Sequence, residues 1–112
     1  LGWDTAAHLS AHGMDGGTLL HVAAWHGNVE IVSLLLRQYR DRIDLEHKDP
    51  THHGTPIGWA IYGSKHAWSK GGDHAAVVQQ LIDAGAKLPD KVHDASLAVR
   101  EVLHKHGVPD AN

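Results

Sequence analysis

The sequence contains no cysteine and no phenylalanine. The absence of cysteine excludes disulfide bonds, thiolate zinc sites and a cysteine nucleophile. No stretch approaches the roughly 18 consecutive apolar residues of a membrane-spanning helix, and no basic segment precedes an apolar one near the start, as it does in a secretory signal. We therefore expect a soluble, cytoplasmic chain without a membrane partner.

An excess of positive charge is also missing. The chain has 10 Lys and Arg against 13 Asp and Glu, with a net charge of -3, and its basic residues are scattered along the sequence. A protein that follows a phosphate backbone usually gathers its basic residues in a stripe, so nucleic acid is not an expected partner. The length of 112 residues and the hydrophobic content of 42% fit one ordinary globular domain.

Histidine is unusually abundant, with 12 copies. Imidazole titrates near pH 6.5, so the net charge should depend strongly on pH around neutrality. Three pairs stand close in sequence, namely His8 with His12, His52 with His53, and His104 with His106. Each pair offers two ligands, whereas zinc needs four, or three and a water. We expect no metal site, and a histidine-based metal or pH sensor stays an alternative.

Apolar periodicity predicts a helix, a tight turn and a second helix near the start of the chain. Residues 18–24 (TLLHVAA) begin a helical pattern, Gly27 and Asn28 interrupt it, and residues 29–36 resume it. Ile31, Leu34 and Leu35 fall on one face of the second segment, and Asn28 is placed to cap it.

The same unit occurs twice. Residues 55–61 (TPIGWAI) repeat the pattern of residues 18–24, and residues 77–82 (VVQQLI) repeat that of residues 31–36 (IVSLLL). Gly85 is placed to end the last of these segments.

A third, weaker pattern follows the two copies. Val99, Val102 and Leu103 share one helical face, so we expect a terminal helix that Asp94 caps and Gly107 ends.

These residues resemble the ankyrin repeat, whose units open with a T-P-L-H-x-A signature on the first of two antiparallel helices. The resemblance is carried by TLLHVAA at 18–24, Gly27, residues 30–36, TPI at 55–57 and AGA at 84–86, and GWAIYGS at 58–64 is similar to a bacterial variant. It implies an all-α, ankyrin-like solenoid of helix-turn-helix repeats with hairpin loops.

The resemblance also divides the single domain, residues 1–112, into units. Residues 1–17 would be the remnant of a preceding unit, 18–54 a first repeat, 55–89 a second repeat with an insertion at 62–74, and 90–112 a C-terminal cap. Leu1 in place of a Met suggests that the chain starts within a longer protein. Loops should absorb the insertion at little cost.

Partner-contact positions follow from the family pattern. They stand just after the Ala pair of each unit and at the tips of the hairpins, with two more in the insertion: Trp25, His26, Tyr62, Met14, Asp15, Gly17, His52, His53, Gly54, His66 and Trp68. We expect Trp59 in the core, His21 in a structural role, and Trp25 either in the core or at an interface. Gly58 takes the place of the signature histidine in the second unit.

Motifs for catalysis are missing. The sequence contains no G-x-S-x-G, no G-x-x-x-x-G-K-[ST] and no G-x-G-x-x-G. Four carboxylates precede the second hairpin, where we expect solvated surface: Asp41, Asp44, Glu46 and Asp49. We expect neither enzyme activity nor a cofactor.

The expected function is protein recognition. The chain would bind a partner protein, or another domain of its own chain, through the concave face of the stack. One alternative is a purely structural segment of a longer protein, which would associate with itself through its truncated N-terminal end.

Overall fold

The structure is a computed structural model that describes residues 19–39, 43–49, 53–67, 72–92 and 95–110. These residues form five α-helices: α2 (Leu19–Trp25), α3 (Val29–Gln38), α4 (Pro56–His66), α5 (His74–Asp83) and α6 (Leu97–Lys105). No strand occurs within the described ranges, where Val92 and Asp110 form one isolated bridge. The predicted all-α class is confirmed.

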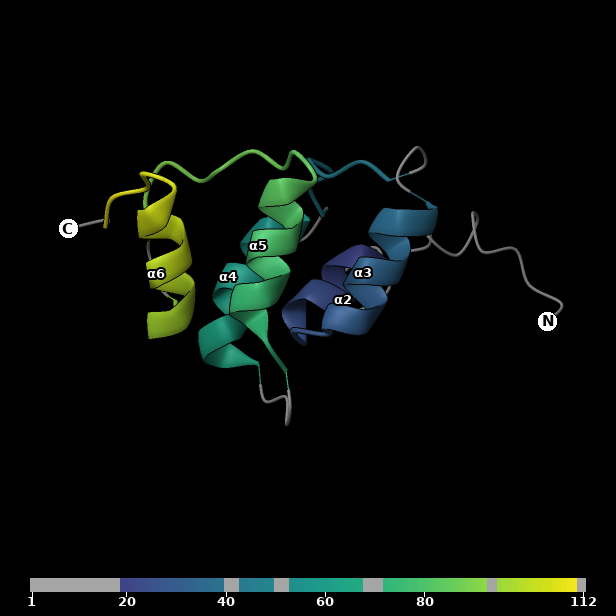
Figure 1. Ribbon diagram of the computed structural model, residues 1–112, viewed down its shortest axis with the longest axis horizontal. Helices are drawn as coiled ribbons and strands as arrows, with labels where there is room; N and C mark the ends of the chain where they lie inside the picture. Colours follow the sequence, from purple (N-terminus) through teal and green to yellow (C-terminus); the bar gives the residue numbers. More distant parts are fainter. Residues whose placement is uncertain (1–18, 40–42, 50–52, 68–71, 93–94, 111–112) are drawn as a thin grey trace, which may run out of the picture.

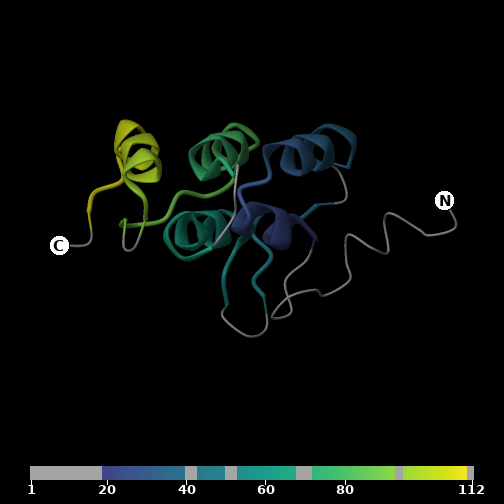
Figure 2. The same ribbon diagram turned by 90° about the horizontal axis from the view of Figure 1, so that it is seen from below.

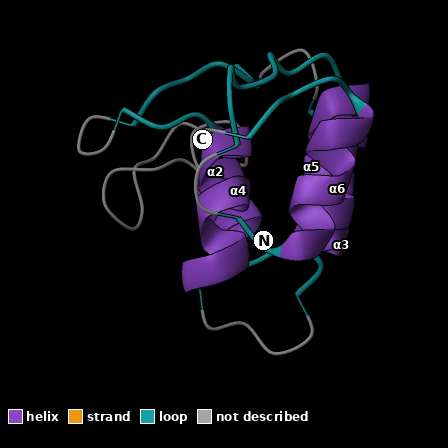
Figure 3. Cartoon of the chain, turned by 90° about the vertical axis from the view of Figure 1, so that its left-hand side faces the viewer, coloured by secondary structure: helices purple, strands orange, loops and turns teal. Residues whose placement is uncertain are grey.

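The helices stand in two rows, as Figures 1 and 2 show. The helices α2 and α4 form one row, here called the inner row, and α3, α5 and α6 form the other, the outer row. Each inner-row helix precedes its outer-row neighbour in the chain, and α2 leads into α3 through a turn at residues 26–28. The described parts of the connections that follow α3 and α5 lie together at one end of both layers (Figure 3). This is the arrangement expected of stacked helix-turn-helix repeats.

Side-chain caps start two helices, α3 and α4, where the sequence indicates them. The Asn28 side chain accepts a hydrogen bond from the backbone N–H of Ile31 over 3.2 Å, as predicted. Thr55 accepts one from Gly58 over 3.3 Å, with Pro56 in the first turn of α4. These bonds satisfy N–H groups that the first turn of a helix leaves without a partner.

The predicted cap of the last helix is wrong. Ser96, not Asp94, caps α6, and its hydroxyl accepts from the backbone N–H of Val99 over 3.3 Å. The backbone N–H of Ser96 in turn donates to the Ser64 hydroxyl of α4 over 2.9 Å. This bond to α4 fixes the start of α6 at Ser96. Because Ser64 is distant in the sequence, a search for local capping residues does not reveal the contact.

Three glycines end or separate helices with left-handed backbone. Gly27, Gly85 and Gly107 have φ values of 66°, 104° and 88°. A side chain strains this conformation, so glycine is the residue that fits it best. The predictions for all three are confirmed.

The core lies between the two rows. The small residues Ala23 and Ala24 are buried on α2, and Ala60 is buried on α4, so the inner-row helices approach closely. The larger buried side chains come from every described helix: Leu20, Val32, Leu35, Ile57, Val77, Val78, Leu81, Val99 and Leu103. Val99 and Leu103 are buried and Val102 is partly buried against the core, so the predicted shared face of these three residues is confirmed.

Part of the expected insertion is helical. We expected a loop from residue 62 onward, but α4 continues to His66, and α5 begins at His74. Gly63, which would ordinarily weaken a helix, is buried here, and an added Cβ atom would collide with the backbone of Trp25 in α2. The missing side chain lets α4 run past the end of α2, so residues 62–66 extend the helix.

Candidate partner-binding surface

His21 holds the hairpin between the two helix pairs. Its ring is fully buried, and Nε2 lies 2.9 Å from both the carbonyl oxygen of His47 and that of Gly54. Because both partners are acceptors, Nε2 carries the proton and donates. Burial lowers the pKa of His21 below its ordinary value of 6.5, which keeps the ring neutral. The expected structural role of this histidine is confirmed.

Asp49 contradicts the expectation of solvated surface. Its side chain is fully buried, and one oxygen, Oδ1, accepts from the backbone N–H of Gly54 over 2.8 Å and from Nε1 of Trp59 over 2.9 Å. Burial of a carboxylate is costly unless hydrogen bonds replace its water, as these two do. A local signal existed, because Asp followed by Pro within a short turn is typical of a side chain that bonds to its own loop.

Trp59 joins the hairpin to the inner row. The side chain is buried, as predicted, and its ring packs edge-on against His21 and Trp25 at centroid distances of 5.2 and 6.2 Å. Because its Nε1 donates to Asp49, Trp59 connects α4 to the hairpin. Its ring also packs against that of Trp25.

From Trp59 a continuous set of rings leads outward to the protein surface. We call Trp59, Trp25, Tyr62 and His66 the aromatic row. The Trp25 and Tyr62 centroids lie 5.8 Å apart, and Tyr62 stacks on His66 at 4.2 Å with 24° between the planes. Trp25 is half-buried, whereas 51% of Tyr62 is exposed. The row therefore begins in the core and ends in solvent.

The backbone of Trp25 is held by the neighbouring helix pair. Its carbonyl oxygen accepts from Nε2 of His74 over 2.7 Å, and the Gly27 carbonyl accepts from the Asp73 N–H over 2.9 Å. Gly63 of α4 packs directly against the same backbone. Neither His74 nor Gly63 was singled out from the sequence as a supporting residue, because both act through contacts between residues far apart in the chain.

The predicted contact residues fall into two groups. Six of them lie on the inner row, directly after it or on the hairpin that follows α3: His26, Tyr62, His66 and His53 are exposed, and Trp25 and Gly54 are half-buried. Gly54 is half-buried at the hairpin base, where His21 and Asp49 bind it. Five others lie outside the described residues: Met14, Asp15, Gly17, His52 and Trp68.

The next connection, residues 84–92, is held differently from the hairpin. Gly58 occupies the position of the signature histidine, and it has no side chain that could hydrogen-bond to this connection. The backbone N–H of Lys87 instead donates to the Glu46 carboxylate over 2.8 Å, and that of Val92 donates to the Pro109 carbonyl over 2.8 Å. Hydrogen bonds to the hairpin and to the C-terminal residues thus hold this connection, in place of the bonds that a histidine side chain would form.

The described ranges hold no group of three or more His, Cys, Asp or Glu side chains that could bind a metal ion. His104 forms a pair with Asp110, with 2.9 Å between Nε2 and Oδ1. Within the same ranges, every helix is too short or too polar to cross a membrane.

A family comparison covers the first helix pair, α2 and α3. Residues 15–50 match the model of the family described as "Ankyrin repeat". Neither the curated proteins nor the solved structures gave a match. Ankyrin repeats are generally modules of protein–protein interaction, and their signature histidine and hairpin correspond to His21 and its contacts. Residues 15–50 are thus similar to an ankyrin repeat, and the two rows of helices agree with this similarity.

Proposed function

We propose that this chain binds a partner protein through the concave face of its stack, with Tyr62 as the central contact. The observation that carries the proposal is that half of Tyr62 is exposed although its ring packs on both Trp25 and His66. An exposed aromatic side chain that is already held loses little rotamer freedom on binding, and such residues often dominate the energy of an interface.

The support beneath Tyr62 favours the same role. Trp25 is fixed through its carbonyl by His74, and Trp59 is fixed through its indole by Asp49. A surface whose supporting side chains are hydrogen-bonded is organised before its partner arrives, and this lowers the cost of ordering on binding.

Leu97 provides a natural comparison. It is more exposed than Tyr62, at 73%, but it stands at the start of α6 in the outer row. Single exposed apolar residues are common on protein surfaces and need no partner. We therefore assign binding to the surface around Tyr62 and use Leu97 as the control.

The test is affinity capture from a lysate of the source cell, with the unchanged chain, Tyr62→Ser and Leu97→Ser compared side by side. Circular dichroism and urea unfolding first establish that both variants fold. The proposal predicts a protein that the unchanged chain and Leu97→Ser retain and Tyr62→Ser loses. Equal capture by all three chains, or capture by none, contradicts it.

A further inference from the structure

The ring of Tyr62 is already in contact with two other rings. His66 stacks on it with 4.2 Å between the centroids and 24° between the planes, and Trp25 lies at 5.8 Å with 32° between the planes. A stacked neighbour covers the face of a ring, so the face against His66 is closed to further groups. Since 51% of Tyr62 is nevertheless exposed, a partner meets the edge of the ring and its hydroxyl, which stacking leaves open.

The Tyr62 hydroxyl is not engaged within the protein. Among the described residues, none forms a hydrogen bond with it. The indole Nε1 of Trp59, at the buried end of the aromatic row, differs in this respect because it donates to Asp49. A phenol hydroxyl can donate one hydrogen bond, and a polar group that loses its water without gaining a partner costs free energy. A protein that covers Tyr62 therefore has to bring an acceptor.

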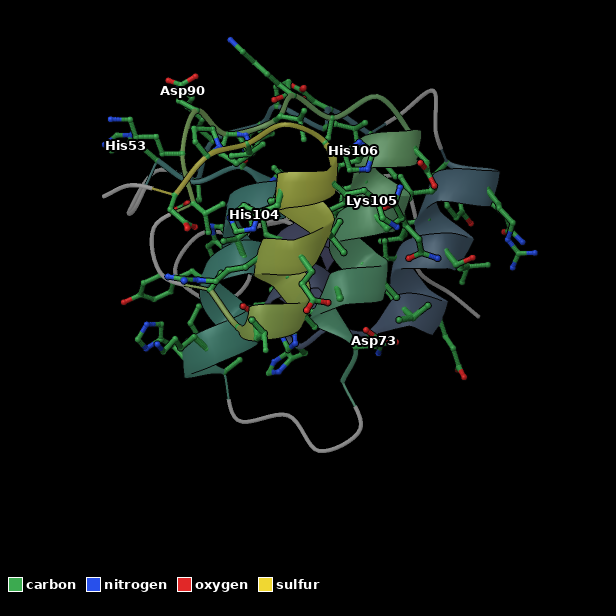
Figure 4. All side chains as sticks on the ribbon, turned by 60° about the vertical axis from the view of Figure 1, so that its left-hand side comes forward. His53, Asp73, Asp90, His104, Lys105 and His106 are labelled. Carbon is green, nitrogen blue, oxygen red and sulfur yellow. The ribbon has the colours of Figure 1, made fainter. Side chains whose placement is uncertain are left out.

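Exposed charges of both signs lie on the neighbouring elements. Lys65 is exposed three residues after Tyr62. Asp73 is exposed where α5 begins, at the opposite end of the helices from His53 (Figure 4). The hairpin after α3 adds two carboxylates and one ammonium group, namely Asp44, Glu46 and Lys48. Attraction of a charged acceptor by one sign is thus offset by the other, which favours a neutral acceptor.

We propose that the Tyr62 hydroxyl donates a hydrogen bond to a main-chain carbonyl oxygen of the partner protein. This inference rests on the proposed function and names the group of the partner that Tyr62 recognises. A main-chain carbonyl is neutral, occurs at every residue and is held without loss of side-chain freedom. A segment that covers the ring but has no acceptor at this point leaves the hydroxyl unpaired, so the contact discriminates between partners.

The test compares Tyr62→Phe, which removes only the hydroxyl, with Tyr62→Ser, which also removes the ring. Tyr39→Phe is the matched control, because Tyr39 is the other tyrosine of the chain and lies half-buried at the end of α3 in the outer row. The probes are peptides selected against the unchanged chain from a random library displayed on phage. Fluorescence anisotropy measures their affinities for all four chains, after urea unfolding has established that each variant folds.

Tyr62→Phe should weaken the binding of the selected peptides about tenfold, and Tyr39→Phe less than about twofold. Since the Tyr62 hydroxyl has no partner among the described residues, Tyr62→Phe should unfold at the same urea concentration as the unchanged chain. A loss of affinity without a loss of stability separates a contact with the partner from a structural role.

Backbone esters in the peptides locate the acceptor. Replacement of one amide by an ester weakens the carbonyl oxygen as an acceptor. One ester position should weaken binding to the unchanged chain severalfold and leave binding to Tyr62→Phe unchanged, because the two changes remove the same hydrogen bond.

The contrary outcomes separate the two proposals. Peptides that bind Tyr62→Phe as tightly as the unchanged chain but lose binding in Tyr62→Ser would overturn the hydrogen bond and leave the proposed surface in place. A loss in Tyr62→Phe that is reproduced by neutralising a peptide carboxylate, and by no ester, would overturn the main-chain acceptor. Peptides that bind Tyr62→Ser unchanged, or no enrichment at all, would overturn both proposals.

Discussion

The indole Nε1 of Trp59 donates a hydrogen bond to Oδ1 of Asp49 over 2.9 Å in the interior of the protein. Trp59 belongs to α4, and Asp49 belongs to the hairpin that follows α3. The same Oδ1 also accepts from the backbone of Gly54. This one oxygen therefore connects the hairpin, the second helix pair and, through the Trp59 ring, the aromatic row.

Removal of the Trp59 donor should destabilise the fold. Trp59→Phe leaves the buried carboxylate with one hydrogen bond fewer, which should cost about 1–3 kcal/mol in the free energy of unfolding. Asp49→Ala removes both bonds at Oδ1 and should cost at least as much. Asp49→Asn, whose amide oxygen can still accept, should cost less than Asp49→Ala. Urea unfolding of the three variants measures these differences, and equal stability of Asp49→Asn and Asp49→Ala would refute the hydrogen-bonding account.

The approach of α4 to α2 depends on the missing side chain of Gly63. A Cβ atom there would collide with the backbone of Trp25, so Gly63→Ala should destabilise the protein by about 2 kcal/mol or more. Gly58→Ala is the matched control in the same helix, because the nearest atom to its added Cβ would be the Thr55 hydroxyl at 3.5 Å. That variant should be neutral or more stable by up to about 1 kcal/mol, since alanine favours helix over glycine.

Thermal unfolding monitored by circular dichroism compares the two alanine variants. Tryptophan fluorescence adds a local readout, because Trp25 lies at the collision. The account fails if Gly63→Ala is as stable as Gly58→Ala.

Acidification should weaken the fold through His21. Burial lowers the pKa of His21 below its ordinary value of 6.5, so the unfolded chain binds this proton more readily than the folded one. The contribution of His21 to stability is complete above pH 6.5 and is lost as the pH falls from there toward the lowered pKa. Urea unfolding at several pH values measures the loss, and NMR titration of the His21 ring measures its pKa. A His21 pKa at or above 6.5 would be incompatible with this account.

Much of the fold can be predicted from residues that are close together in the sequence. The cap at Asn28, the Thr-Pro start at Thr55 and the left-handed turns at Gly27 and Gly85 each depend on residues within one helical turn, so the sequence alone predicts them. The division into repeats at 18–54 and 55–89 stays a prediction, because the family match covers residues 15–50.

Contacts between distant residues account for the wrong expectations. Asp49 is buried because Trp59, ten residues later, donates to it, and Ser96 starts α6 where its backbone meets Ser64. At Gly63 the lack of a Cβ atom lets α4 pass close to the backbone of Trp25 and continue beyond it. In the candidate site, the exposure of Tyr62 agrees with its position in the family pattern. The hydrogen bonds of His74 to Trp25 and of Asp49 to Trp59 join residues that only the folded chain brings together.

The central claim is that the surface around Tyr62 contacts a partner protein, and site-specific photo-crosslinking tests it most directly. A benzophenone amino acid replaces Tyr62 in one version of the chain and Leu97 in another, and both are irradiated in a lysate of the source cell. The account predicts one discrete crosslinked protein from position 62 and none of that mass from position 97. The same products from both positions, or no product from position 62, would contradict it.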